Sequence, residues 1–210
     1  MGGILDAHVE WAVVNRLKTM LDEPPKTKFN VTQSFALFTT VLLWAKNRAW
    51  VAGFERERTV FGDPTDRSAH DARRELRDQL ICGDPWRLSR RTPIFPAPFP
   101  LPEEDINSDF EAMTAEDFFE WLRNAVAHGD GRNIRAIHKL SRRGDRTLLA
   151  GFRVEGRESQ RSPRRLVLSL YHADMRRIGA LLADQFCRSM SGDNQYALQE
   201  TGTSRVDEAA

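Results

Sequence analysis

Hydrophobic residues recur every three to four positions in several stretches of the chain, a spacing that places them on one face of an α-helix. This pattern predicts helices over residues 4–21, 31–52, 68–81, 114–128 and 173–188. Pro24 and Pro25 follow the first predicted helix and Gly83 follows the third, and both residue types commonly end helices. Most of the chain is therefore expected to be helical.

Two segments late in the chain have the composition of β-strands instead. TLLAGFRV (147–154) and RLVLSLY (165–171) are rich in β-branched and apolar residues and are joined by a loop of Gly, Ser, Pro and Arg. We therefore predict a small β-hairpin over residues 147–171. A chain of 210 residues is long enough for one buried core, so we expect a single, mainly α domain with the hairpin inserted before the last helix.

Prolines cluster between the third and fourth predicted helices. Six of the ten prolines lie within residues 84–102, interleaved with Trp86, Phe95 and Phe99. Because proline fixes φ and lacks an amide hydrogen, this segment is predicted to be an extended strap that its aromatic residues hold against the body. The alternative is a ligand for an SH3-type domain. Residues 191–210 carry four acids and one base and are predicted to form a disordered tail.

Composition restricts the class of protein. The two cysteines, Cys82 and Cys187, make no disulfide framework, and no Cys or His cluster has the spacing of a zinc site. The longest apolar run, residues 35–45, is about half of what a spanning helix needs, and the N-terminal segment does not resemble a signal peptide. We expect a cytoplasmic protein with no metal, no cofactor and no membrane association.

Charge is distributed unevenly, although the net charge is only +1. Residues 101–120 carry eight acids and no base, whereas residues 132–165 carry eleven Lys or Arg and three acids. A polyanion would be drawn to the second segment and repelled by the first. The alternative is a solvated, arginine-rich surface with no ligand.

The helix predicted over residues 114–128 has recognisable signals at both ends. Thr114 is the expected N-cap, and Asp117 three residues later completes a variant of the capping box. Gly129 is placed to be the residue that follows the C-cap.

The polar side of this helix carries three side chains with complementary chemistry. Asn124 and His128 are one turn apart, and the long side chain of Arg123 reaches toward the same point. A guanidinium matches a pair of phosphate oxygens, and an imidazole exchanges protons near neutral pH. The set favours metal-free RNA cleavage, in which the 2′-OH attacks phosphorus and leaves a 2′,3′-cyclic phosphate and a 5′-OH. The alternative is that Arg and His only cap the last carbonyls of the helix.

One histidine and one arginine make a small site, because in-line displacement benefits from both a base and an acid. A two-fold homodimer that brings two copies of this helix together would supply two of each, and the small Ala127 would permit close approach.

Residues after the helix are candidates for further contacts. Arg132 and Arg135 can hold flanking phosphates of RNA, an interaction that weakens with salt. Asp130 is expected to form an Asx-turn and to pair with an arginine. The other four histidines, which have no convincing companions, are expected to be surface or packed residues: His8, His70, His138 and His172.

The polar end of the helix resembles the R-x4–6-H signature of the HEPN superfamily, in its form with an asparagine directly after the arginine: RNAVAH, residues 123–128. The longer phrase LRNAVAHGDGRNI resembles in particular a plasmid-borne, uncharacterised HEPN-like subfamily. The resemblance implies an up-and-down helical bundle over residues 1–190, from which the hairpin and the proline strap are departures.

The same resemblance implies a function. It is that of a homodimeric, metal-independent endoribonuclease with Arg123, Asn124 and His128 in the catalytic roles, acting as a toxin or defence effector. The implied partner is a cognate antitoxin of the nucleotidyltransferase type. Other members are inactive modules that bind nucleotides, RNA or proteins, which is the alternative function. A purely structural dimerisation domain is a third hypothesis.

Overall fold

The computed structural model describes residues 9–24, 28–55, 74–89, 108–159 and 161–190. Three predicted features lie outside these ranges: the tail over residues 191–210, the proline strap beyond Ser89, and the first part of the helix predicted over residues 68–81. His8 and His70 lie outside them as well.

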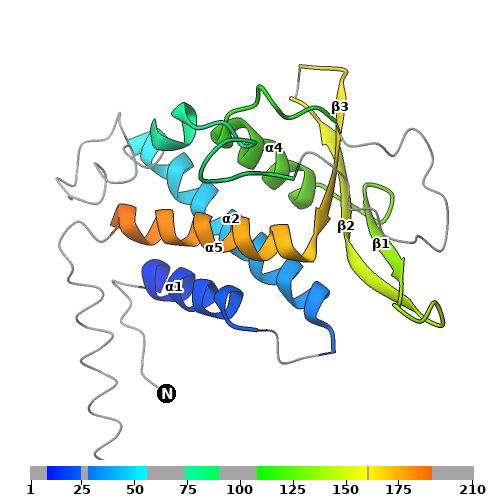
Figure 1. Ribbon diagram of the computed structural model, residues 1–210. Helices are drawn as coiled ribbons and strands as arrows, with labels where there is room; N and C mark the ends of the chain where they lie inside the picture. The colour runs from blue at the N-terminus through cyan, green and yellow to red at the C-terminus, as the bar shows by residue number, and fades with distance from the viewer. Residues whose placement is uncertain (1–8, 25–27, 56–73, 90–107, 160, 191–210) are drawn as a thin grey trace, which may run out of the picture.

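Three long helices pack against one another and form the main body. These are α1 (Val9–Asp22), α2 (Asn30–Glu55) and α5 (His172–Met190), which confirms three of the predicted helices within the described ranges. In Figure 1, α1 and α5 lie side by side and α2 passes behind α5, and both α1 and α2 contact α5 extensively. Among the described helices, none combines the length and apolar character that crossing a bilayer requires.

The helical spacing of the sequence correctly identifies the buried stripe of α5. Its four periodic apolar residues are all at most 5% exposed: Met175, Ile178, Leu182 and Phe186. Phe38 and Leu42 of α2 are buried in the same core. Burial of each such side chain contributes about 1.5–3 kcal/mol to folding.

A three-stranded antiparallel sheet closes one end of this helical layer (Figure 1). Strand β2 (Thr147–Arg157) lies in the centre, between β1 (Ile134–Leu140) and β3 (Arg165–Tyr171). Tyr171 is followed directly by α5, so β3 continues into the helical layer without a loop. The ring of Phe152 lies 4.3 Å from that of Phe35 on α2, measured between centroids, and joins the sheet to the helices.

The predicted fold class, a mainly α up-and-down bundle with a hairpin insertion, is wrong. The chain forms a mixed α/β fold, because the sheet has a third strand and belongs to the main core. The sheet contributes four residues to the cluster that the helices form: Val154, Leu166, Leu168 and Leu170. Strand β1 escaped prediction because its sequence, IRAIHKL, is rich in charge and only Ile137 in it is buried.

The helix predicted over residues 68–81 ends earlier than expected. Its described helical residues are 74–78, and Leu80 instead pairs with Thr114 in an isolated β-bridge. The Ile81 N–H donates to the Met113 carbonyl at 3.0 Å. Hydrogen bonding to the segment before α4 therefore replaces the helical hydrogen bond that Ile81 would otherwise make. Trp86, the first aromatic of the predicted strap, is 1% exposed and its indole N–H donates to Gln79.

Helix α4 (Ala115–Ala127) packs between α2 and the sheet and contacts both α2 and β2. Its apolar face is buried, as its periodicity predicts, through Phe118, Phe119, Trp121, Leu122 and Ala125. The contact with β2 is unusually close at Gly156. A Cβ on that glycine would lie 2.7 Å from Ala125 Cβ and 3.2 Å from the indole nitrogen of Trp121. Only a residue without a side chain lets α4 rest on the end of β2.

This close approach generates a stability prediction. The substitution Gly156→Val forces a branched side chain between α4 and β2, and overpacking of this kind costs about 1–3 kcal/mol. We expect the free energy of unfolding, measured by urea denaturation, to fall by that amount. Gly131→Ala is the matched control, because nothing lies within 4 Å of a Cβ at that position. An unchanged midpoint for Gly156→Val would show that the helix and the strand are not in contact there.

Candidate functional site

The ends of α4 are fixed by local hydrogen bonds. Thr114 is the N-cap, as predicted, and its hydroxyl accepts from the Asp117 N–H at 3.1 Å while donating to the Asp117 carboxylate at 2.9 Å. His128 is the C-cap, and its backbone N–H donates to the Asn124 carbonyl at 3.0 Å. The cap therefore sets the position of the candidate histidine relative to the last turn.

Gly129 follows the C-cap, as predicted, but not for the expected reason. Its φ is not in the left-handed region that glycine commonly adopts after a helix. A Cβ there would lie 2.5 Å from Cδ1 of Ile134. Glycine is required because strand β1 begins directly against the end of α4.

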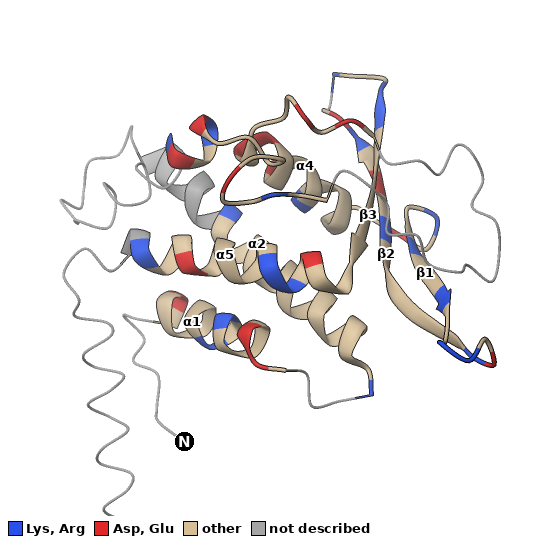
Figure 2. Ribbon diagram, in the orientation of Figure 1, with Lys and Arg blue, Asp and Glu red and all other residues tan. Residues whose placement is uncertain are grey.

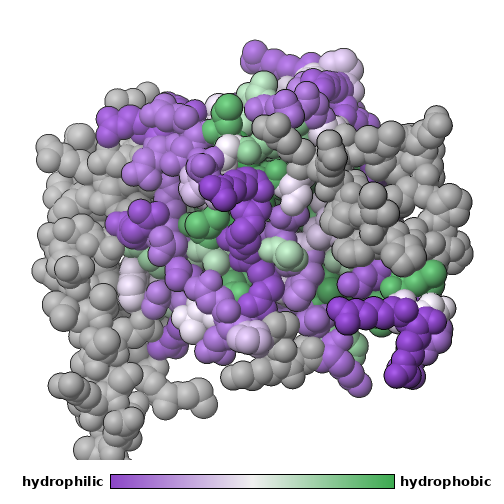
Figure 3. Space-filling view, in the orientation of Figure 1, coloured by the Kyte–Doolittle hydropathy of each residue, from purple (hydrophilic) through white to green (hydrophobic). Residues whose placement is uncertain are grey.

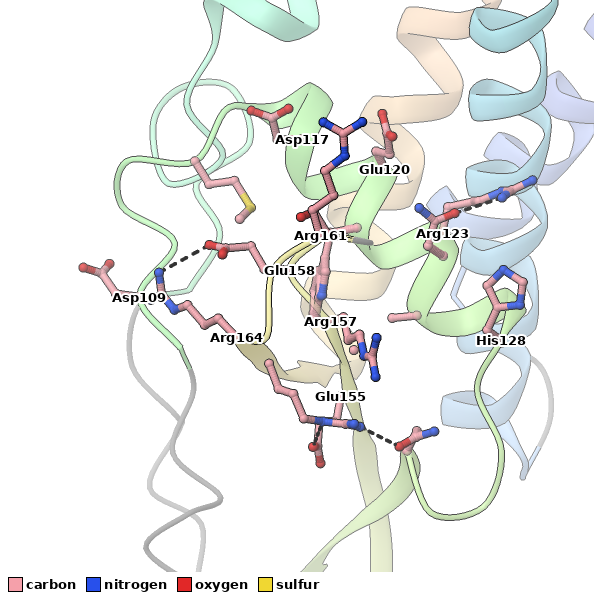
Figure 4. Close-up of a pocket in the computed structure, with 18 of the residues that line it drawn as sticks. Asp109, Asp117, Glu120, Arg123, His128, Glu155, Arg157, Glu158, Arg161 and Arg164 are labelled. Atoms are coloured by element: carbon pink, nitrogen blue, oxygen red, sulfur yellow. Dashed lines mark hydrogen bonds and ion pairs between the residues drawn. The ribbon is translucent and has the colours of Figure 1, made fainter.

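The three candidate catalytic residues share one open cavity of about 1240 Å³ (Figure 4). Asn124 and His128 are exposed and Arg123 is half-buried. One guanidinium nitrogen of Arg123 donates to the side-chain oxygen of Asn124 at 2.9 Å. Neither imidazole nitrogen of His128 has a hydrogen-bond partner in the described part of the chain. The arginine and histidine that the sequence singles out thus face the same solvent-filled space.

The opposite wall of the cavity comes from the sheet. It consists of the end of β2, the start of β3 and the turn between them (Figure 4). The charged residues on this wall are Glu155, Arg157, Glu158, Arg161, Arg164 and Arg165. Figure 2 shows Lys and Arg on the strands of the sheet and acids on and before α4, while both kinds of charge also occur on α1 and α5.

Arginines and carboxylates line the cavity in equal number, five of each, and two of the arginines form ion pairs with glutamates of the same wall. Arg165 forms an ion pair with Glu155 and donates to the Asn133 side chain at 2.9 Å. Arg164 pairs with Glu158 at 3.3 Å. The charges of Arg164 and Arg165 are therefore largely compensated by neighbouring carboxylates.

Three guanidinium groups in the cavity are not compensated in this way. Arg157 and Arg161 form no ion pair with any described residue, and the Arg123 guanidinium donates to the neutral amide of Asn124 without an ion pair among the described residues. On the acidic side, Glu120 lies 3.6 Å from Lys46, whereas Asp117 is held by a hydrogen bond rather than by a cation. Arg161 extends toward Asp117 and Glu120, which form an acidic rim, whereas Arg157 lies between Glu155 and the end of α4 (Figure 4).

The structure does not bring Arg132 and Arg135, the two residues predicted to bind flanking phosphates of RNA, into this cavity. The Arg132 side chain is 91% exposed and pairs with Asp130 at 3.1 Å, and Arg135 lies 3.8 Å from Glu155. The sequence grouped all these arginines into one basic segment. It could not separate the arginines on the cavity wall from the others without the strand pairing.

Asp130 forms the predicted Asx-turn and pairs with an arginine. Its Oδ1 accepts from the Arg132 backbone N–H at 2.8 Å, which closes the turn between α4 and β1. This backbone hydrogen bond, assisted by the Arg132 guanidinium, holds the pKa of Asp130 below its ordinary value. Within the described residues, no group of three or more His, Cys, Asp and Glu side chains is arranged to hold a metal ion.

Comparison with known proteins gives no match among family models, curated proteins or solved structures.

The Asx-turn generates a prediction on pH dependence. A carboxyl whose pKa is lowered by folding stabilises the fold above its unfolded pKa of about 3.9, and this contribution is lost as the pH falls through the folded value. A carboxyl ¹³C NMR titration should place the Asp130 pKa below 3.9, and Asp130→Asn should remove its share of the acid dependence of stability. Arg132→Ala retains the backbone N–H, so most of the shift should remain. An ordinary pKa for Asp130 would contradict the turn.

Proposed function

We propose that the cavity binds single-stranded RNA and that the protein is a metal-independent endoribonuclease whose attacking group is the 2′-OH of the substrate. The supporting observation is that Arg123, Asn124 and His128 line one open cavity whose lining also includes Arg157, a guanidinium that forms no ion pair with a described residue. Such a charge attracts phosphate, and the open cavity admits a polymer.

In the proposed reaction His128 acts as the general base. The unprotonated imidazole of His128 takes the proton from the 2′-OH, and the 2′-oxygen forms a bond to the adjacent phosphorus. The bond from phosphorus to the 5′-oxygen breaks, and that oxygen takes a proton from an acid. The products are a 2′,3′-cyclic phosphate and a 5′-OH. DNA is spared because it has no 2′-OH.

Arg123 and Asn124 are proposed to bind the phosphate that reacts. A guanidinium has five N–H donors, so the bond that Arg123 makes to Asn124 leaves further donors for two phosphate oxygens. The same bond orients the Asn124 amide with its oxygen toward Arg123, which leaves its N–H groups for the substrate. Charge that develops on the phosphate oxygens is stabilised by these fixed donors.

A homodimer completes the proposed chemistry. One His128 can provide the base, and the same residue of a second copy can provide the acid for the leaving oxygen. Ala127 is exposed at the end of α4, where a small residue permits the close approach of a two-fold partner. The proposal includes action in the cytoplasm as a toxin or defence effector, with a cognate antitoxin of the nucleotidyltransferase type.

The decisive test is a cleavage assay with His128→Ala on a labelled single-stranded RNA. We expect the rate to fall at least about 100-fold, because general acid–base catalysis typically contributes 10²–10⁴. The wild type should remain active in EDTA, should leave the DNA of the same sequence intact, and should produce 2′,3′-cyclic ends. His138→Ala is the control, because His138 lies on β1 and does not line the cavity. Equal rates for His128→Ala and the wild type would refute the assignment.

One observation favours a second candidate, a binding module without turnover. The His128 ring has no partner in the described residues that would hold it in a productive orientation. In that case RNA or a nucleotide would bind without being cleaved. Arg123→Ala would abolish binding, whereas His128→Ala would leave it unchanged.

A further inference from the structure

We propose that Arg157, at the end of β2, is a further phosphate-binding residue that holds the RNA strand on the side of the cavity opposite Arg123. This inference rests on the proposed function and assigns a role to a wall of the cavity that lies about thirty residues along the chain from α4.

The position of Arg157 follows from the contact that fixes α4. Gly156 packs against Ala125 of α4, and Arg157 is the next residue of the strand. Both Gly156 and Arg157 line the cavity. Pairing of Arg157 with Arg165 on β3 holds its backbone in the ladder. Figure 4 shows its guanidinium between Glu155, which pairs with Arg165, and the end of α4 that carries His128. A charge placed in this way can contact a phosphate next to the one that Arg123 binds.

The pairing of the neighbouring arginines singles out Arg157. Arg164 and Arg165 would have to loosen ion pairs with Glu158 and Glu155 to bind a phosphate. Arg161 forms no ion pair, but Figure 4 shows it directed toward Asp117 and Glu120 on the acidic rim, where a phosphate is repelled. Arg157 is the arginine on this wall that is both uncompensated and turned toward the candidate catalytic residues.

The experiment measures the affinity of the full-length protein for a fluorescent single-stranded RNA. The RNA is 2′-O-methylated, so that it has no nucleophile and is not cleaved, and titrations are repeated over a series of salt concentrations. We expect Arg157→Ala to weaken binding about tenfold, the effect of losing one hydrogen-bonded charge. The slope of log K against log salt should fall by about 0.7, the contribution of one phosphate contact in a single strand.

Two further variants make the result specific. Arg157→Lys keeps the charge, so it should restore the salt slope while recovering only part of the affinity. Arg142→Ala removes an equal charge from the β1–β2 turn, outside the cavity, and should leave both quantities unchanged. Circular dichroism establishes that each variant is folded.

The possible failures are distinguishable. If the wild type binds RNA and all of these variants share its affinity and salt slope, the role of Arg157 is overturned and the proposed function stands. If Arg142→Ala weakens binding as much as Arg157→Ala, binding depends only on overall charge and the role of Arg157 is again overturned. If the wild type neither binds nor cleaves RNA, the proposed function fails and this inference fails with it.

Discussion

The contact between Gly156 and the face of α4 that carries Trp121 and Ala125 is the constraint on which the site depends. It sets how close the helix and the central strand approach, and this distance is too short for any side chain at residue 156. Because the apolar face of α4 is fully occupied by this contact and by the core, the opposite face is left to solvent. The cavity is the space between that polar face and the chain where it leaves β2.

Local signals in the sequence were sufficient to predict the features that depend on residues close together along the chain. The caps of α4, the turn at Asp130 and the buried stripe of α5 each involve contacts within a few positions along the chain. Such contacts follow from helical geometry and from the hydrogen-bonding capacity of Thr and Asp, whatever the rest of the fold does. The three residues at the end of α4 belong to this class, and they do line one cavity.

Features that depend on distant partners could not be predicted in the same way. Strand β1 forms because its backbone hydrogen-bonds to that of β2. Its own sequence does not alternate clearly between apolar and polar residues, so it does not indicate a buried side of a strand. The mixed fold follows, since a sheet that shares the helical core is not an insertion. The place of Arg157 and Arg161 in the cavity wall could not be predicted for a related reason. Only tertiary contacts show which arginines of a basic segment are paired with carboxylates.

Composition does not distinguish the arginines of the site from one another. Equal numbers of arginines and acids line the cavity, and the ion pairs of Arg165 with Glu155 and of Arg164 with Glu158 leave three of each. Arg157 differs from the other arginines of this wall because it forms no ion pair with a described residue and lies close to the end of α4 (Figure 4). The β1–β2 turn, residues 141–146, shows the contrast. It projects from the lower right of the molecule with a strongly hydrophilic surface (Figure 3), but none of its residues lines the cavity. Net charge alone would not distinguish the two surfaces.

The most direct test of the central claim is an NMR titration of the ¹⁵N-labelled protein with a 2′-O-methylated single-stranded RNA. If the polar face of α4 and the end of β2 form one RNA site, the backbone amides of residues 123–129 and 155–158 should shift together, with a single apparent affinity. The amides of residues 141–146 in the β1–β2 turn should stay in place. Shifts confined to that turn, or an α4 that does not respond, would contradict the account.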